Sequence, residues 1–478
     1  MTPSDTGSAI QALLILVDVL AASAAAGHAL LNKRDPRSAW GWILASILMP
    51  LVGPLLYYFL GINRAHWRAR HAMGVRAVPV GPSAMALSTA PGLMTPEQKE
   101  REELVRIGGV MSGRPLLPGN LVTPLFSGEQ AYPAMLEAIA GARHSVWLSS
   151  YIFSGAGIGE RFALALSDAQ ARGVTVRVLL DGIGDLYYRP RGSTLLRRHG
   201  VVVRMFQVPR RFPPMLHLNL RNHRKLLIVD GRSAFLGGMN IGDHHYAGAR
   251  RRPTLDLHFR VEGPVVRQLE QVFTADWHYA AAEDLAVTRE DPPPSGPAAC
   301  RALTDGPNEE LETIQLVMLG ALATAHRCVH IMTPYFIPTP ELAGALQATA
   351  LRGVEVVLIL PERSNLPWLD WATRHWLRPH LQREIRVFWR KPPFAHSKMF
   401  LVDDYYALVG SANLDSRSLR LNFEVMLEVY DTDLVANLGQ HFAQVRCESR
   451  ELVLQELEEK PLAVRLRNAV SWLFSPYL

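Results

Sequence analysis

The sequence predicts an α/β protein with two similar domains that follow a two-helix transmembrane hairpin. Each domain is expected to hold a mixed, mostly parallel sheet flanked by helices, and the two are expected to adopt a pseudo-twofold arrangement. Three observations carry this prediction: two long apolar runs near the N-terminus, alternating strand and helix patterns through most of the 478 residues, and a repeat of that alternation. The net charge of +6 suits an anionic partner such as nucleic acid, phospholipid or a membrane surface.

The two apolar runs cover residues 10–31 and 40–60, and each is about as long as a membrane-spanning helix requires. The segment between them, "NKRDPRS", is short and basic, and tryptophan and tyrosine lie near the ends of the second run. Asp18 in the first run is costly in lipid unless it faces protein or water. Residues 1–64 are therefore expected to form a transmembrane hairpin, with a buried core hairpin as the alternative.

A connector, residues 65–118, separates this hairpin from the first α/β domain, predicted at 119–284. Its helical patterns "GEQAYPAMLEAIAGAR" and "GERFALALSDAQARG" alternate with the strand patterns "SVWLSSYIF" and "VTVRVLLDG". A strand, a helix and a second strand in succession indicate a βαβ unit, which pairs its strands in parallel.

The same order of patterns then recurs. The stretches "ARGVTVRVLLD" and "LRGVEVVLILP" align residue by residue, and the repeat is longer than that of a solenoid. The proline-rich stretch "REDPPPSGPAA" predicts a linker at 285–300, followed by a second domain at 301–460. Residues 461–478 form an amphipathic C-terminal segment that either lies on a membrane or docks on the protein.

Each repeat carries the motif H-x-K-x4-D-x6-G-[GS]-x-N near its end. Histidine and lysine are two residues apart at the start of a strand, so their side chains share one face. In a hairpin the asparagine returns beside the histidine. The motif residues are His223, Lys225, Asp230 and Asn240 in the first copy, and His396, Lys398, Asp403, Ser411 and Asn413 in the second.

These residue types suit phosphodiester chemistry without a metal or another cofactor. Lysine and asparagine donate hydrogen bonds that hold phosphate oxygens and stabilise the charge that develops in the transition state. Histidine attacks phosphorus or transfers a proton to or from oxygen, and one histidine cannot do both at once. Two copies that face each other would supply one histidine for each task.

A catalytic histidine also needs an acceptor for its second ring nitrogen, which fixes the tautomer. Asp256 and Glu424 lie on later strands at comparable distances after the two motifs and are the candidates for this orienting role. Asp230 and Asp403 belong to the catalytic motifs, but they end their strands facing away from the lysines. We expect them to fix a turn or a buried contact. His244 and His245 are expected at the surface.

The doubled motif resembles the signature of the phospholipase D superfamily. Further stretches are similar to bacterial cardiolipin synthases: "SAWGWILASILMPLVGPLLYYFLG", "LNLRNHRKLLIVDG", "MTPYFIP", "GSANLDSRSLRLNFE" and the ending "SPYL". Two departures from the family pattern stand out. Gly238 occupies a position that often holds serine, and "LQREIRVFW" lacks a glycine often found before the strand that leads to the second motif.

The resemblance implies phosphatidyl transfer from one phosphatidylglycerol to another, giving cardiolipin and glycerol. It assigns His223 as nucleophile and His396 as general acid and then base, although the near symmetry leaves the reverse open. The lysines and asparagines, with Ser411, would hold the phosphate. It also implies a multi-pass protein of the bacterial inner (cytoplasmic) membrane with its catalytic domains on the cytoplasmic side, although lysine and arginine lie on both sides of the membrane in similar number, in the turn of the hairpin and after its second run.

Other activities and partners stay open at this point. The alternatives are a hydrolase of the same superfamily, a transferase with phosphatidylethanolamine or a free alcohol as acceptor, and a lipid-binding scaffold without activity. The membrane hairpin argues against a nuclease, so no nucleic-acid partner is expected. The sequence leaves the oligomeric state open, a homo-oligomer included.

Overall fold

The structure is a computed structural model that describes residues 3–33, 36–62, 96–208, 220–246, 253–287, 291–306 and 312–475. The chain divides into two compact units, Met1–His71 and Ala72–Leu478. Each unit has its own packing and is described by itself.

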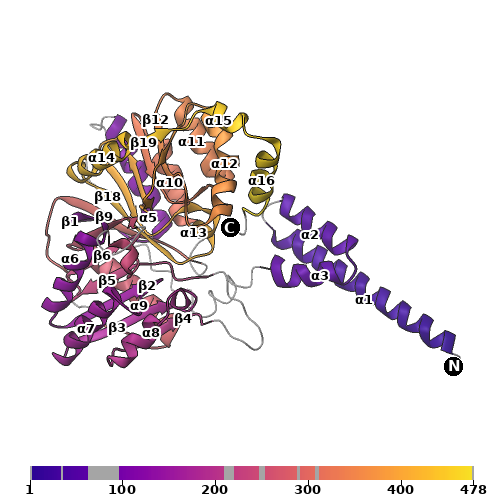
Figure 1. Ribbon diagram of the computed structural model, residues 1–478, viewed down its shortest axis with the longest axis horizontal. Helices are drawn as coiled ribbons and strands as arrows, with labels where there is room; N and C mark the ends of the chain where they lie inside the picture. Colours follow the sequence, from indigo (N-terminus) through magenta and orange to yellow (C-terminus); the bar gives the residue numbers. More distant parts are fainter. Residues whose placement is uncertain are drawn as a thin grey trace. The chain divides into compact units, whose positions relative to one another are not determined.

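The N-terminal unit is built from helices (Figure 1). Helix α1 (Pro3–Asn32) contains Ile10–Asn32, which has a mean hydropathy of 2.0 and is the one helix among the described residues long and apolar enough to cross a membrane. The second apolar run is not one continuous helix. It forms α2 (Pro36–Leu48), α3 (Val52–Leu56) and the π-helical turn η1 (Tyr57–Gly61).

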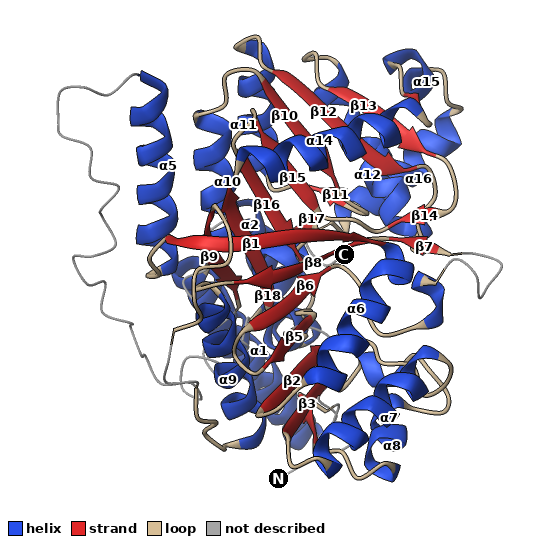
Figure 2. Cartoon of the chain, turned by 90° about the vertical axis from the view of Figure 1, so that its left-hand side faces the viewer, coloured by secondary structure: helices blue, strands red, loops and turns tan. Residues whose placement is uncertain are grey.

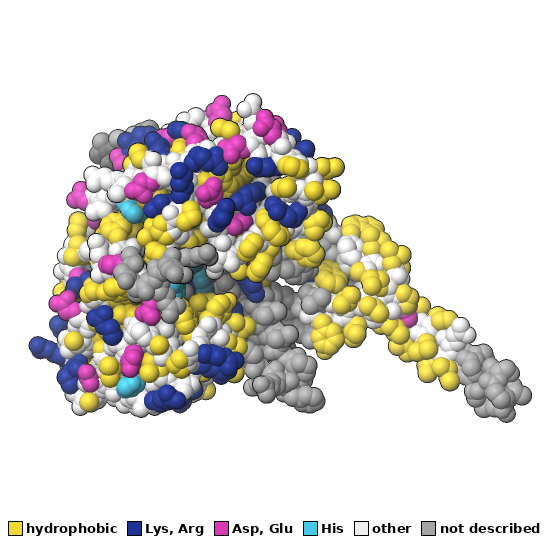
Figure 3. Space-filling view, in the orientation of Figure 1, with side chains coloured by type: hydrophobic (Ala, Val, Ile, Leu, Met, Phe, Trp, Pro, Cys, Tyr) yellow, Lys and Arg dark blue, Asp and Glu magenta, His cyan; other side chains and the backbone are white. Residues whose placement is uncertain are grey.

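The break in the second run has a local cause and is tied to α1. Leu51, next to a proline, has φ 58°, and its N–H donates to Asp18 Oδ1 at 2.6 Å. A Cβ on Gly53 would lie 2.0 Å from the carbonyl oxygen of Ala45, so this close approach requires glycine. Asp18 thus pairs two helices of the unit by binding a backbone amide at the start of α3. The described surface of the unit is mostly apolar (Figure 3).

The second unit holds one sheet of 15 strands in which the two repeats are mirrored. The first repeat contributes the order β4-β3-β2-β5-β6-β8-β1 and the second β9-β18-β16-β15-β10-β12-β13, with β19 at the far edge, and the two meet where β1 pairs with β9. The elements of the first repeat are α5 (Pro96–Ser112), β1 (Leu117–Phe126), α6 (Ser127–Gly141), β2 (Ser145–Ser150), α7 (Ile158–Ala171), β3 (Thr175–Asp181), η3 (Gly184–Leu186), α8 (Gly192–Arg198), β4 (Val203–Phe206), β5 (Leu226–Val229), β6 (Ser233–Gly237), η4 (Asp243–His245), β7 (Thr254–Leu255), β8 (Leu257–Glu262) and α9 (Val266–Ala281).

The second repeat follows the same plan, which confirms the predicted α/β fold with two related halves. Its strand β9 begins within the last residues of the predicted linker. The elements are β9 (Ala298–Asp305), α10 (Thr313–Ala323), β10 (Cys328–Met332), β11 (Phe336–Ile337), α11 (Pro340–Leu351), β12 (Glu355–Pro361), α12 (Pro367–Leu381), β13 (Arg386–Arg390), β14 (Phe394–Ala395), β15 (Met399–Val402), β16 (Tyr406–Gly410), β17 (Leu414–Asp415), α13 (Ser416–Arg420), β18 (Glu424–Tyr430), α14 (Thr432–Cys447), β19 (Ser449–Glu451), α15 (Leu454–Glu458) and α16 (Leu462–Leu473).

The sheet is mixed, as predicted, but it is not mostly parallel. In the large sheet, parallel pairing is confined to β2–β3–β4 and β10–β12–β13, and the other neighbours are antiparallel. The reason is the short turn after each H-x-K strand: Asp230 and Asp403 both have φ 53° and reverse the chain into β6 and β16. Strands joined by so short a turn pair antiparallel.

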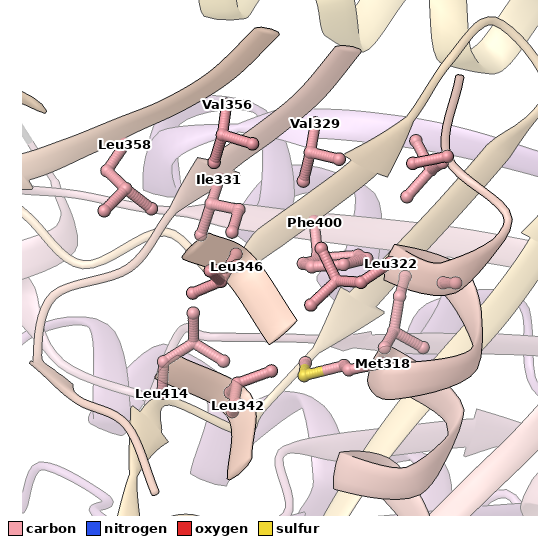
Figure 4. Close-up of a cluster of buried hydrophobic side chains, with 14 of the residues drawn as sticks. Met318, Leu322, Val329, Ile331, Leu342, Leu346, Val356, Leu358, Phe400 and Leu414 are labelled. Atoms are coloured by element: carbon pink, nitrogen blue, oxygen red, sulfur yellow. The ribbon is translucent and has the colours of Figure 1, made fainter. Parts of the chain in front are cut away.

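Helices cover both faces of the sheet, so each half buries its own core. In Figure 2, α6, α7 and α14 pass in front of the strands, and α10 and α11 lie behind them. Figure 4 shows the core of the second half, where Leu342 and Leu346 of α11 and Met318 of α10 pack on Val329 and Phe400. The matching core of the first half lies among α6, α7, α8 and strands β2 to β5. These two rigid halves position the residues described next.

Candidate active site

Each motif histidine is fixed by a strand-like contact with the other half of the protein. The His223 N–H donates to the carbonyl of Phe423 at 2.9 Å, and the His396 N–H donates to the carbonyl of Leu255 at 2.7 Å. The first contact belongs to a parallel bridge between Asn222 and Phe423, and the second to the short parallel pair β14–β7. The two motifs therefore converge because each is paired with backbone that precedes the other half's acidic residue.

Those backbone contacts bring each imidazole beside a carboxylate from the opposite half. His223 Nδ1 lies 2.9 Å and 3.1 Å from the two carboxylate oxygens of Glu424. His396 Nδ1 lies 2.8 Å from Asp256 Oδ2. The sequence singled out both acids, each downstream of the motif in its own half, and the structure pairs them across the halves. A carboxylate at Nδ1 holds the proton there, so Nε2 carries the lone pair.

The two motif lysines lie against their own histidines. Lys225 Nζ donates to the backbone carbonyl of His223 at 2.7 Å, and Lys398 Nζ donates to that of His396 at 2.5 Å. Lys398 Nζ also lies 2.8 Å and 3.0 Å from the two ring nitrogens of His396. Both lysines are only 2% exposed. Two buried lysine amino groups beside two imidazoles form a site that is suited to a phosphate group, because both lysines donate hydrogen bonds.

The ionisation of the two histidines is shifted in the same direction. Burial lowers the pKa of His223, an effect that the charge of Glu424 opposes and that of Lys225 reinforces. Burial lowers the pKa of His396 well below its ordinary value, and the charges of Lys398, Lys225 and His223 add to the shift. For both imidazoles the shift of the pKa favours the neutral form.

The two carboxylates, in contrast, shift in opposite directions. Burial raises the pKa of Asp256, although the charge of Lys398 opposes this. For Glu424 the effect of burial is outweighed by the charge and hydrogen bond of His223, the charge of Lys225 and the hydrogen bond from Ser411, so its pKa is lowered. Burial lowers the pKa of Lys398 to about 8.

A serine-for-glycine difference accounts for part of this asymmetry. Ser411 Oγ donates to Glu424 Oε2 at 2.5 Å, and Val425 N–H donates to Ser411 Oγ at 3.0 Å. At the matching position, a Cβ on Gly238 would lie 2.3 Å from Asp256 Oδ1. Gly238 thus leaves room for a shorter carboxylate that approaches more closely.

The motif asparagines follow β6 and β16 at equivalent places and are both 5% exposed. Asn240 Oδ1 accepts from the backbone N–H of Ile152 at 3.1 Å, which leaves its Nδ2 as the donor end of the amide. The backbone N–H of Asn240 lies 3.3 Å from His245 Nε2. Each asparagine therefore follows a strand, β6 or β16, that pairs with the strand directly after the motif lysine, β5 or β15.

The motif aspartates serve the fold at the opposite end of their strands. Asp230 accepts from the backbone N–H groups of Arg143, His144 and Ser145 at 2.9, 2.7 and 2.8 Å. Asp403 binds the equivalent turn before β10 through the N–H groups of residues 326 to 328, at 3.1, 2.7 and 3.0 Å. Each aspartate ties the hairpin that follows its H-x-K strand to the neighbouring strand.

Several aromatic neighbours of the histidines were not identified from the sequence. The rings of Tyr151 and His223 lie 5.3 Å apart, and those of Tyr335 and His396 lie 6.4 Å apart. The two tyrosines are not equivalent, since Tyr335 corresponds to Ile152 of the first repeat. A tyrosine soon after each of the strands β2 and β10 is the signal that could have found them. The prediction that His245 lies at the surface is wrong: it is 1% exposed, and its ring is 6.4 Å from that of His396.

In the described parts of the chain, no group of three or more histidine, cysteine, aspartate or glutamate residues could hold a metal ion. The arrangement instead presents two imidazoles and two lysine amino groups, with each imidazole oriented by a carboxylate. Two α/β repeats that together build this site define a phosphoryl-transferring enzyme of the phospholipase D type.

Comparison with known proteins agrees and is more specific. The family model described as "Cardiolipin synthase, PLD-like domain" matches residues 135–277 and 318–446, and "Phospholipase_D-nuclease N-terminal" matches residues 13–61. The chain is 31% identical to the cardiolipin synthase of Oceanobacillus iheyensis, over 98% of this chain and 99% of the relative. It is 32% identical to cardiolipin synthase A of Pseudomonas entomophila, over 95% of each. The chain belongs to the cardiolipin synthase family of phosphatidyltransferases, which confirms the resemblance seen in the motifs.

One solved structure shows the fold independently. The phosphatidylserine synthase of Haemophilus influenzae matches with a TM-score of 0.63 at 15% identity, over 80% of this chain and 100% of that chain. This likeness establishes that the mirrored pair of α/β repeats is a known architecture.

Proposed function

We propose that the enzyme makes cardiolipin and glycerol from two molecules of phosphatidylglycerol. His223 Nε2 attacks the phosphorus of the first lipid, the bond from phosphorus to the glycerol oxygen breaks, and His396 gives that oxygen a proton. The terminal hydroxyl of the second lipid then loses its proton to His396 and attacks phosphorus, and the phosphorus–nitrogen bond breaks. No metal ion takes part in these steps.

The observation that carries this proposal is the pair of cross-half contacts, His223 with Glu424 and His396 with Asp256. Both rings are held by Nδ1, so both direct Nε2 to the phosphate. In this proposal Lys225, Lys398 and the two asparagines bind the phosphate oxygens. A negative phosphodiester in the site raises the pKa of His396, which supplies the proton that the leaving glycerol needs.

The test is to incubate the purified protein with phosphatidylglycerol alone. The proposal predicts cardiolipin and glycerol in equal amounts, and no loss of activity with a chelator. Phosphatidic acid and glycerol as products would instead identify a hydrolase. Cardiolipin formation only after addition of phosphatidylethanolamine or a free alcohol would identify another acceptor.

We infer that the protein is a multi-pass protein of the bacterial inner membrane with its catalytic unit on the cytoplasmic side. The length and apolar character of α1, and the apolar α2 and α3 tied to it, support this topology. The exposed Cys447 on the catalytic unit is a natural reporter. A membrane-impermeant maleimide should label Cys447 in inside-out vesicles but not in intact spheroplasts, with Cys447→Ser as the control. Labelling in spheroplasts would contradict this orientation.

A further inference from the structure

The last helix, α16, exposes an apolar stripe. Leu462, Leu466, Val470 and Leu473 follow one another at intervals of four, four and three, so they line one side of the helix, and Phe474 follows at its end. Their exposed fractions are 68, 56, 54, 65 and 58%. We call these five residues the α16 outer face. Isolated exposed apolar residues are common, but a continuous stripe of this kind marks an interaction site.

The opposite side of α16 packs on α12, so the helix is fixed to the protein (Figure 1). The ring of Trp472 lies 6.3 Å from that of Trp376 and 4.9 Å from that of His375. The guanidinium of Arg467 lies 4.4 Å from the centre of the Trp371 ring. The helix is therefore docked by its inner side, and its outer face is exposed among the described residues of the second unit.

Through these contacts α16 is connected to the wall of the active site. Trp472 and Trp376 pack on the same buried cluster as Tyr335 and Phe394. The rings of Tyr335 and Phe394 lie 6.4 Å and 5.7 Å from the His396 ring. This cluster of side chains thus connects the helix with a histidine of the site. A surface that α16 contacts is held close to the catalytic groups.

Charge favours an anionic surface as the partner. The sequence of α16, "LAVRLRNAVSWL", contains two arginines and no acidic residue. On a helical projection Arg465 and Arg467 flank the apolar stripe on its two sides, and both are exposed. An apolar strip between basic side chains is typical of helices that lie in the interface of an anionic membrane.

We propose that the α16 outer face docks on the surface of a phospholipid bilayer that contains anionic lipid. The proposal rests on the proposed function, because a lipid-using site gains from contact with the layer that supplies its substrate. A second copy of the chain fits this face less well. A twofold contact centred on it would bring the arginines of both copies together, and like charges oppose such a contact.

The direct test measures membrane contact without turnover. In a Cys447→Ser background, Val470→Cys of the full-length protein is labelled with an environment-sensitive fluorophore and reconstituted into phosphatidylglycerol vesicles. Lipid brominated in the upper part of its acyl chains should quench this fluorophore. The matched control is Leu164→Cys on α7, which is 46% exposed and should stay unquenched.

Two results would overturn the proposal. Quenching of the Val470→Cys label no stronger than that of the control would place the face in water. Protection from both brominated lipid and aqueous iodide would show that protein, such as a second copy, covers it. Either result leaves the proposed cardiolipin synthesis intact, since that is tested by its products.

A second experiment tests what the contact does for activity. The double variant Leu466→Glu/Val470→Glu is compared with Leu164→Glu/Leu351→Glu on vesicles and on a monomeric short-chain phosphatidylglycerol. The ratio of vesicle to short-chain activity should fall about tenfold or more in the first variant, since two buried apolar contacts are lost, and stay constant in the control. If the ratio of vesicle to short-chain activity stays unchanged in the first variant, membrane docking is contradicted. The same holds if activity falls equally on both substrates, because the ratio is then also unchanged.

Discussion

The two halves of the active site follow one plan but differ in the groups that hold their histidines. Around His223, Glu424 is hydrogen-bonded by Ser411, and its pKa is lowered. Around His396, Gly238 stands in place of the serine, and burial raises the pKa of Asp256. Glu424 is thus the more firmly ionised carboxylate. A nucleophilic imidazole gains positive charge as it attacks, so this half suits the nucleophile.

A second difference lies directly behind the two histidines. Arg224, between His223 and Lys225, forms a buried ion pair with Asp276 at 2.7 Å and donates to the carbonyl of Glu424 at 2.9 Å. Its counterpart is Ser397, which with Asp256 lines a cavity of about 420 Å³. Arg224 therefore braces the chain behind His223, whereas a cavity lies at the matching place behind His396. This difference favours His223, which is held in place, as the nucleophile, and His396, which has more room to move, as the general acid and base.

The largest effect is expected from the histidines themselves. His223→Ala and His396→Ala should each lower the rate of cardiolipin formation by about 10⁴-fold or more, because each removes a group that acts on the reacting atoms. A nitrophenyl ester of phosphatidic acid separates their roles, because its leaving group needs no proton. His396→Ala should then release one burst of nitrophenolate per enzyme, and His223→Ala should release none. Equal bursts from both variants would contradict the division of roles.

The next effect concerns the carboxylates and pH. Glu424→Gln should lower the rate by about 10²- to 10⁴-fold. The charge of Glu424 raises the pKa of His223, so its removal lowers that pKa further below 6.5. The acid limb of the nitrophenolate burst rate should therefore move to lower pH in Glu424→Gln. Asp256→Asn, which touches the other histidine, should leave this limb in place, and a shift of the limb in Asp256→Asn alone would reverse the assignment.

The ion pair of Arg224 with Asp276 behind His223 should contribute to the free energy of unfolding. Arg224→Met removes the cation that pairs with the buried Asp276, for which the expected loss is about 3–5 kcal/mol in the free energy of unfolding. Ser397→Ala, at the matching place beside the cavity, removes no charge partner and should lower it by about 1 kcal/mol or less. Thermal unfolding of the two variants in detergent checks the difference, and similar losses would show that the halves are equally braced.

The smallest effect is expected at the serine–glycine pair. Ser411→Ala removes a hydrogen bond to a charged group, with an expected loss of about 1.5–3 kcal/mol in transition-state stabilisation, read from kcat/KM. Gly238→Ser places a Cβ against Asp256 and should lower stability without any gain in rate. A Gly238→Ser enzyme as stable and active as the parent would show that the glycine is not needed for the close approach of Asp256.

The sequence could predict the parts of the site that are local or repeated. The periodicity of strands explains the spacing of His223 and Lys225, which recurs at His396. The periodicities of strands and helices also predict the βαβ unit before each motif. The cross-pairing could not be predicted, since it depends on which loop edges meet when two halves pack. The antiparallel hairpins and the break at Leu51 depend on turn conformations that periodicity does not show. His245 was placed at the surface because nothing in its neighbours signals burial.

The most direct test of the two-histidine division of labour is to locate the covalent intermediate. The His396→Ala protein, reacted with the nitrophenyl ester, is denatured with detergent in the cold at mildly basic pH, where both the phosphorus–nitrogen bond and the acyl esters survive. It is then digested, and its peptides are measured by mass spectrometry. A phosphatidyl group on the peptide that contains His223, and its absence after the same treatment of His223→Ala, is the predicted result. A labelled His396 peptide in the His223→Ala protein, with none at His223 in the other variant, would contradict the account.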